Sequence, residues 1–263
     1  MPQNKNKTGY DAVIFGSVGT VGIRVIEELI SSGFQVHAVT NNLGGSRGLE
    51  EWFANDFIVG NIVYYRNINA YMFDDFLKFE EEFNQLHGRP ISCVVFCLAL
   101  GPQNGFMEEV PLDVQNASDA MWDGIVDQYV HYFSRVIAYL TPLLDTVCDI
   151  VFVTSGIADL ESKKCPPWLT SDIYQRGKTR LDSFIQSIRS MVDFKGRVVS
   201  IHRIGISSQY YLMGMLIPCA KLSSLQMPMD GLTRALQEVI WGEVEVDYDF
   251  VSEFSPSLVT DHE

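Results

Sequence analysis

Short apolar runs alternate with longer amphipathic segments along most of the 263-residue chain. The first of these runs, Tyr10 to Phe15, is almost continuously apolar and is followed by Gly16. Runs of this kind are typical of strands buried on both faces of a parallel sheet. We predict strands at residues 10–16, 34–40, 57–65, 91–99, 149–155, 197–205 and 244–251.

The segments between these runs carry apolar residues at helical spacing. In the first of them Val21, Val25 and Leu29 recur every four residues, and Gly33 follows the predicted end. We predict helices at residues 20–32, 71–88, 119–144, about 171–192 and 230–242. Strands that alternate with helices imply βαβ units with right-handed crossovers. The predicted fold class is therefore α/β, a Rossmann-like doubly wound parallel sheet with helices on both faces, in a single domain spanning residues 1–263.

The composition limits the partners of the chain. Apolar residues make up 47 % of it, which is enough for a sizeable core. The 33 acidic residues outnumber the 19 basic ones and give a formal net charge of −14. Because such a surface repels phosphate backbones and anionic lipid, we expect neither nucleic acid nor a membrane as a partner. A phosphate-bearing cofactor can still bind, since local backbone dipoles hold anions even in an acidic protein.

The cysteines and the N-terminus suggest a compartment. None of the five cysteines falls in a CxxC pair, which favours reduced thiols in the cytosol. The first ten residues are polar and lack the apolar core of a signal peptide, so we expect a cytoplasmic protein. The five histidines show no metal-binding spacing, and we expect no metal.

The first predicted strand-to-helix turn reads GSVGTVG and places glycines at positions 16, 19 and 22. Glycine allows a tight turn, close approach of a phosphate and close packing of the helix on the strand. A pyrophosphate would then meet the positive end of the helix. A tight turn without a ligand is the alternative. The residues that we expect to contact the cofactor here are Gly16, Ser17, Val18, Gly19, Thr20, Val21 and Gly22.

Three further residues extend this pattern. Ser155 ends the predicted strand 149–155, and Tyr174 and Lys178 follow on one face of a predicted helix, one turn apart. With the Gly-x-x-Gly-x-x-Gly spacing, with WDGIVDQYVHYF (122–133) and with CLALG (97–101), they give a chain that resembles the short-chain dehydrogenase/reductase family over nearly its whole length. Without those companions, the Tyr–Lys pair would be read as surface residues.

The resemblance implies that Ser155, Tyr174 and Lys178 are catalytic. Tyrosine ordinarily has a pKa near ~10, and a neighbouring ammonium from Lys178 would favour the phenolate and lower that pKa. Ser155 would hydrogen-bond the substrate oxygen, and Lys178 would also bind the nicotinamide ribose. By the same resemblance, the further cofactor contacts are Asn67, Ile68, Cys97, Leu98, Ala99, Tyr174, Lys178, Gly205 and Ile206.

The end of the second predicted strand bears on the choice of nicotinamide. Sites for NAD place an acidic residue there to bond the ribose hydroxyls, but this chain has Thr40 and Asn41. Arg47 follows and could reach an added phosphate. We therefore expect NADP(H); NAD(H) bound through neutral contacts is the alternative.

Several features depart from the family pattern. Tyr129 stands where the family often has an asparagine that supports a water chain to the lysine. Residues 156–172 are a longer connection than usual, which we interpret as an inserted lip. Residues 206–230 would form the substrate-binding loop and helices, with Tyr210, Tyr211 and Met213 facing a small, mainly apolar or aromatic substrate; core or dimer packing is the alternative. A homodimer or homotetramer through helices 119–144 and 171–192 is implied by the resemblance.

The sequence therefore predicts an NAD(P)(H)-dependent carbonyl reductase or alcohol dehydrogenase. Two alternatives remain open. One is an epimerase or dehydratase of the same family that retains its cofactor, and the other is a nucleotide-binding interaction protein without catalysis.

Overall fold

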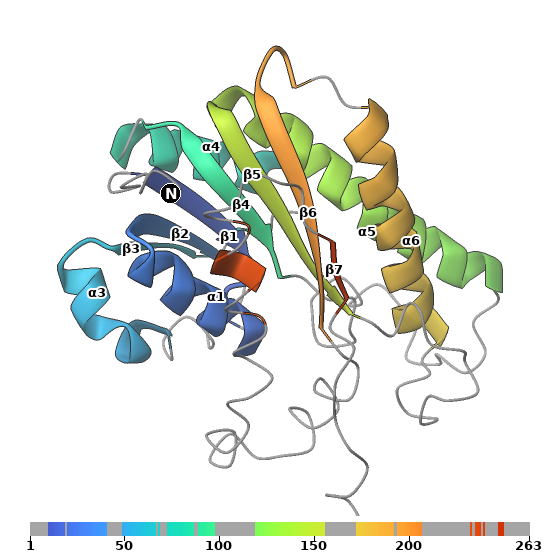
Figure 1. Ribbon diagram of the computed structural model, residues 1–263, viewed down its shortest axis with the longest axis horizontal. Coiled ribbons are helices and arrows are strands. Elements are labelled where there is room, and N and C mark those ends of the chain that lie inside the picture. The colour runs from blue at the N-terminus through green and yellow to red at the C-terminus, as the bar shows by residue number, and fades with distance from the viewer. Residues whose placement is uncertain are drawn as a thin grey trace, which may run out of the picture.

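In the part of the chain that the structure describes, seven strands form one sheet in the order β3-β2-β1-β4-β5-β6-β7 (Figure 1). Every neighbouring pair is parallel. The strands are β1 Tyr10–Phe15, β2 Phe34–Thr40, β3 Ile62–Arg66, β4 Ile91–Phe96, β5 Leu144–Ser155, β6 Val198–Ile206 and β7 Asp247–Asp249. The computed structural model describes residues 10–18, 20–40, 49–66, 68, 73–86, 89–97, 119–155, 172–191, 194–206, 232, 235–237, 239 and 247–249.

The strand order contains one reversal. From β1 the chain moves outward to β2 and β3, then returns to place β4 on the other side of β1 and continues to β7. Loops that leave β1 and β4 therefore diverge at the carboxyl edge of the sheet, which is where open α/β sheets bind their ligands. The predicted doubly wound parallel sheet is confirmed.

Helices cover both faces of the sheet (Figure 1). They are α1 Thr20–Ser31, α3 Ala54–Ile58, α4 Phe73–Leu86, α5 Asp119–Leu140 and α6 Asp172–Met191. On one face, side chains of α4, α5 and α6 share a core with alternate residues of the strands. On the other, α1 and the helical residues at 232, 235, 236 and 239 form a second core. Strands β1 and β4 lie between the two cores, which explains why their sequences are apolar apart from Asp11 and Ser92.

The prediction of a strand at residues 57–65 was wrong in its first part. Phe57 and Ile58 belong to α3, and the strand begins only at Ile62. Gly60 has a φ of 78°, and the backbone N–H of Asn61 donates to the Asp56 carbonyl oxygen across it. This left-handed glycine ends the helix and leaves Ile58 and Val59 exposed.

The long helix is also shorter than predicted. It ends at Leu140, followed by a 3₁₀ turn at Thr141–Leu143, and β5 begins at Leu144 instead of residue 149. Pro142 explains the end, since it has no backbone N–H to continue the helical hydrogen bonds. Strand β4 ends at Phe96 and β7 spans three residues. The predicted lip and substrate loop lie outside the described residues, apart from Asp172 and Ile206 at their borders.

Candidate functional site

The turn after β1 is built around close contacts of glycine. Gly16 follows the strand with a φ of 82°, a conformation that favours glycine. A Cβ at Gly22 would lie 2.4 Å from the Gly16 carbonyl oxygen and 2.8 Å from the carbonyl carbon and oxygen of Ser17. The first turns of α1 therefore press directly on the glycine turn. The missing Cβ of Gly22 therefore allows α1 to pack closely on the turn.

Hydrogen bonds join this turn to its neighbours at the carboxyl edge. The buried Ser17 hydroxyl donates to the Val39 carbonyl oxygen at 3.2 Å, near the end of β2. The backbone N–H of Cys97 donates to the Phe15 carbonyl oxygen at 2.9 Å, and that of Ile68 donates to the Thr40 carbonyl oxygen at 3.3 Å. The described residues of the predicted nucleotide site in this half of the chain thus lie along one edge of the sheet. They are Gly16, Ser17, Val18, Thr20, Val21, Gly22, Thr40, Ile68 and Cys97.

The electrostatics of this edge suit an anion. The first N–H groups of α1 have no partner within the helix and form its positive end, and the first turn of α1 contains no acidic residue. Thr40 is the last residue of β2, and its side chain is buried and neutral. A phosphate there would meet no carboxylate from the first turn of α1 or from β2. Gly19, Asn41, Arg47, Asn67, Leu98 and Ala99 lie outside the described residues.

The predicted catalytic residues come from two neighbouring elements. Ser155 ends β5 and pairs with Ile206, the last residue of β6. Tyr174 and Lys178 lie in the first two turns of α6. The side chains of all three lie outside the description, as does that of Tyr129 in α5, so their mutual contacts stay a prediction. Tyr210, Tyr211 and Met213 are not among the described residues.

Two arginines fix the direction of α6 against β6. Arg203 donates from Nε and Nη2 to the two carboxylate oxygens of Asp182, at 2.9 and 2.8 Å. Farther along the helix, Arg189 donates from Nε and Nη2 to the Ile201 carbonyl oxygen, at 3.0 and 2.8 Å. Since Ile201 precedes Arg203 in β6, the helix runs antiparallel to the strand. The start of α6 therefore lies at the carboxyl edge, beside the last residues of β6.

The register of this pairing brings the predicted catalytic positions together. Lys178 precedes Asp182 by about one helical turn, roughly 6 Å of rise. Gly205 follows Arg203 by two strand residues, a similar length. Gly205 pairs with Thr154, the residue before Ser155. The backbone thus places position 178 level with the end of β5 and with Ser155.

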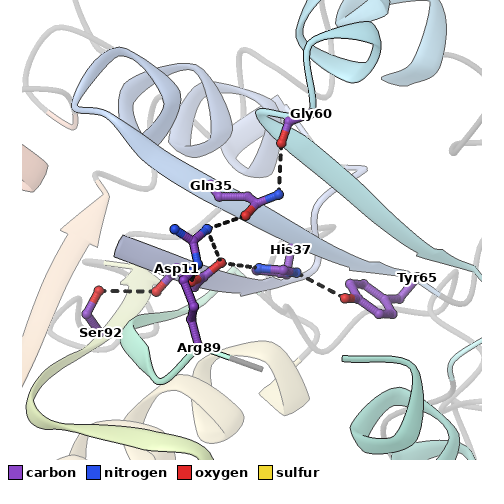
Figure 2. Close-up of polar contacts among 7 residues, drawn as sticks. All are labelled: Asp11, Gln35, His37, Gly60, Tyr65, Arg89 and Ser92. Carbon is purple, nitrogen blue, oxygen red and sulfur yellow. Dashed lines mark hydrogen bonds and ion pairs between the residues drawn. The ribbon is translucent and has the colours of Figure 1, made fainter. Parts of the chain in front are cut away.

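A second polar cluster, which the sequence did not indicate, lies toward the amino ends of β1, β2 and β4 (Figure 2). Phe79 and Phe83 of α4 pack against its Tyr65 and His37 rings. His37 Nε2 lies 2.7 Å from Asp11 Oδ1 and its Nδ1 lies 3.0 Å from Tyr65 Oη. The Nε and Nη2 atoms of Arg89 lie 2.9 and 3.3 Å from the two carboxylate oxygens of Asp11. The same Nη2 donates to Gln35, whose amide donates to the Gly60 carbonyl oxygen.

This cluster is structural. The side chains of Asp11 and His37 have no exposed surface, so no substrate reaches them. Burial lowers the pKa of His37, and the Arg89 charge acts in the same direction, against the hydrogen bond and the charge of Asp11. A neutral imidazole that donates from Nε2 to Asp11 and accepts from the Tyr65 hydroxyl satisfies all three groups. Burial and neighbouring carboxylates raise the pKa of Tyr65.

The described part of the chain shows no group of side chains that could hold a metal ion. Its cysteines, Cys93, Cys97 and Cys148, form no disulfide. No helix within those residues is long and apolar enough to cross a bilayer.

Comparison with known proteins identifies the fold. No protein-family model matches the sequence, and no curated protein matches it either. A solved carbonyl reductase from Pseudomonas aeruginosa PAO1 shares 17 % identity with a TM-score of 0.64, over 91 % of this chain and 96 % of that one. Its complex with NADP gives a TM-score of 0.63 over the same shares of the chains, again at 17 % identity.

An enoyl-[acyl-carrier-protein] reductase (NADH) from Aquifex aeolicus VF5 shares 15 % identity with a TM-score of 0.59, over 79 % of this chain and 80 % of that one. At these identities the likeness concerns the fold. The resemblance to short-chain dehydrogenases/reductases is therefore confirmed at the level of the fold.

Proposed function

We propose that this protein is an NADP(H)-dependent oxidoreductase of the short-chain dehydrogenase/reductase family that interconverts a small, mainly apolar or aromatic carbonyl compound and its alcohol. The observation that carries the proposal is the convergence at one sheet edge. The glycine turn of β1 and α1, the end of β5 at Ser155 and the start of α6 with Tyr174 and Lys178 all lie along it. The solved neighbours are reductases by name, which supports the same class of reaction.

The residues at the glycine turn fit a dinucleotide. Because Gly22 has no Cβ, α1 can pack directly on the backbone of Gly16 and Ser17, which is the role of the last glycine in a dinucleotide-binding turn. The first N–H groups of α1 would bind the pyrophosphate. At the end of β2, the neutral Thr40 tolerates a ribose phosphate, and Arg47 would pair with it. One neighbour was solved with NADP, while another is named for NADH, so the preference for NADP(H) rests on Thr40, Asn41 and Arg47.

The chain's own residues would handle the oxygen of the substrate. When bound, the nicotinamide supplies or accepts hydride. Ser155 would donate a hydrogen bond to the substrate oxygen and orient it. Tyr174 would give that oxygen a proton during reduction and remove it during oxidation. The Lys178 ammonium, one helical turn away, would stabilise the phenolate and hold the ribose.

The test is turnover with a panel of small aromatic and aliphatic carbonyl compounds, with NADPH and NADH supplied separately. We expect oxidation of NADPH with an aromatic ketone or aldehyde, loss of at least 10²-fold in kcat for Tyr174→Phe, and unchanged NADPH affinity in that variant. Arg47→Ala should raise the KM for NADPH and leave that for NADH unchanged. NADPH binding without turnover of any carbonyl would favour a non-catalytic nucleotide-binding protein. A firmly retained nucleotide without net NADPH consumption would favour an epimerase or dehydratase.

A further inference from the structure

The hydroxyl of Thr154 is buried and has no hydrogen-bond partner among the residues that the structure describes. The residue as a whole is 3 % exposed. Asp11, Arg24 and Glu50 also have a buried side-chain atom without a hydrogen bond. Each of these three side chains has another interaction, such as the ion pair of Asp11 with Arg89. A buried hydroxyl without any partner is unfavourable, so an internal water is its usual companion.

The position of Thr154 in β5 locates that hydroxyl. Ile150 and Phe152, four and two residues earlier, face the core beneath α5 and α6. Val151 and Val153 face the opposite core. Because side chains alternate along a strand, Thr154 extends the first set toward α6. Its partner in β6 is Gly205, which brings no side chain to that face. The strand neighbour therefore places no side chain beside the hydroxyl.

The start of α6 covers this part of the sheet. Leu181 and Ile185 are buried against the sheet, and position 178 precedes Leu181 by three residues, on the same helical stripe. The Arg203–Asp182 pair sets the level of the helix. Residue 178 lies one helical turn before Asp182, and Gly205 lies two residues after Arg203. The backbone of residue 178 is therefore opposite the paired residues Thr154 and Gly205. The backbone of residue 178 and the hydroxyl of Thr154 thus lie at the same corner of the fold.

We propose that Thr154 is a positioning residue: its hydroxyl holds an internal water between β5 and α6, and this water accepts a hydrogen bond from the Lys178 ammonium. The proposal rests on the proposed function, because it assigns Lys178 the role of stabilising the Tyr174 phenolate. The water would donate one O–H to Thr154 Oγ1 and accept an N–H from Lys178. It would thereby hold the ammonium toward Tyr174, with no proton or electron transferred.

Thr154→Val tests this, since valine has the shape of threonine without the hydroxyl. We expect a decrease in kcat on the order of tenfold, because a small displacement of a catalytic group is costly. We also expect the pH midpoint of alcohol oxidation to move to higher pH by about one unit, because a loosened ammonium favours the phenolate less. Thr154→Ser should stay within about twofold of wild type at every pH, since it keeps the oxygen.

Thr141→Val is the matched control. Thr141 is another buried threonine, but its hydroxyl donates to the Ile137 carbonyl oxygen at 2.7 Å, near the amino end of β5. This variant should lose stability and keep the wild-type pH profile. A merely structural role of Thr154 would give the same result as Thr141→Val.

Two readouts do not depend on turnover. A high-resolution crystal structure should show a water within hydrogen-bond distance of Thr154 Oγ1, and Thr154→Val should unfold at a lower urea concentration than wild type. An empty site predicts the opposite, because replacing an unpaired hydroxyl with a methyl group of the same shape is neutral or stabilising. The inference would be overturned if the crystal structure showed no water at Thr154 Oγ1 and if Thr154→Val kept the wild-type pH profile. A wild type that turns over no carbonyl compound would instead contradict the proposed function, while the density and the unfolding midpoints would still decide whether the water exists.

Discussion

The guanidinium of Arg203 in β6 and the carboxylate of Asp182 in α6 form two parallel hydrogen bonds, at 2.9 and 2.8 Å. The two side chains are 8 % and 20 % exposed, so water screens the pair only partly. Asp182 lies one helical turn after Lys178, so the ion pair connects α6 to β6, the strand that pairs with the end of β5 at Ser155. The pair therefore sets the level of the predicted catalytic helix against the sheet.

Removing one partner of this pair should affect both stability and turnover. Arg203→Met leaves the Asp182 carboxylate half-buried and without its arginine, which we expect to lower the free energy of unfolding by about 3 kcal/mol. Because α6 carries Tyr174 and Lys178, kcat should fall more than the affinity for nucleotide. Urea unfolding and steady-state kinetics measure the two effects.

Arg180→Met is the matched control for that variant. Arg180 pairs with Asp127 of α5 at 3.2 Å, but the two side chains are 61 % and 49 % exposed. Its loss should change stability by less than about 1 kcal/mol. Equal effects of the two variants would contradict a special role for the Arg203–Asp182 pair.

Gly22→Ala should disrupt the glycine turn. The added Cβ would meet the Gly16 carbonyl oxygen at 2.4 Å, so α1 must move away from the turn. We expect a loss of about 1–3 kcal/mol in stability and, since the helix end would also move from the phosphate, at least about tenfold weaker NADPH binding. Isothermal titration and thermal unfolding measure these changes.

Gly124→Ala in α5 is the corresponding control, because a Cβ there meets nothing within 4 Å. Alanine is the better helix former, so this variant should gain about 0.5–1 kcal/mol and bind NADPH as wild type does. If Gly22→Ala bound nucleotide normally, the glycine turn would not be the pyrophosphate site.

The stability of the protein should decrease in mild acid because of His37. The pKa of His37 in the folded protein is below the ordinary value of 6.5, so the unfolded state binds more protons below that pH. Stability is therefore fully present above pH ~6.5 and decreases as the pH falls, by up to about 1.4 kcal/mol per pH unit until His37 protonates in the folded state.

His37→Gln should remove this part of the pH dependence, although it also weakens the cluster with Asp11 and Tyr65. His131→Gln, at an exposed position of α5, should retain the wild-type slope. Urea midpoints measured from pH 7.5 to 5 separate the variants. A His37→Gln slope parallel to that of wild type would show that His37 does not titrate as described.

Thiol labelling should distinguish the described cysteines. Burial raises the pKa of the Cys148 thiol well above its ordinary value, and Cys93 is also buried, so neither should react with iodoacetamide in the folded protein. Cys97 is half-buried at the carboxyl edge and should react slowly. NADPH should protect Cys97 if it contacts the cofactor, and peptide mass mapping would report each site. Labelling of Cys97 at the same rate with and without NADPH would remove it from the cofactor site.

Local patterns predicted the first strand, the glycine turn and the first helix. The apolar run of β1, the glycines of the turn and the periodicity of α1 lie within about two dozen residues, and each constrains the backbone on its own. The same reasoning misassigned Phe57 and Ile58, because an apolar run does not distinguish a strand from a short helix. In the folded chain Gly60, with its positive φ, separates the short helix that ends at Ile58 from the strand that begins at Ile62.

Long-range pairs could not be predicted in this way. Asp182 and Arg203 are 21 residues apart, and His37 lies 26 residues from Asp11 and 28 from Tyr65. Nothing in the spacing of these residues indicates that they meet, since β-strand pairing and helix packing bring them together. The level of α6, and with it the relation of Lys178 to Thr154, follows only from the folded arrangement.

A crystal structure of the protein with NADPH tests the central claim most directly, through the distances from the Tyr174 hydroxyl to Ser155 Oγ and Lys178 Nζ. We expect the pyrophosphate on the turn from Gly16 to Gly22, and the hydroxyl about 2.6–3.2 Å from Ser155 Oγ, with the Lys178 amine close enough to act on it directly or through one water. A Tyr174 hydroxyl out of reach of both groups, with side chains filling the space above the glycine turn, would contradict the proposed function.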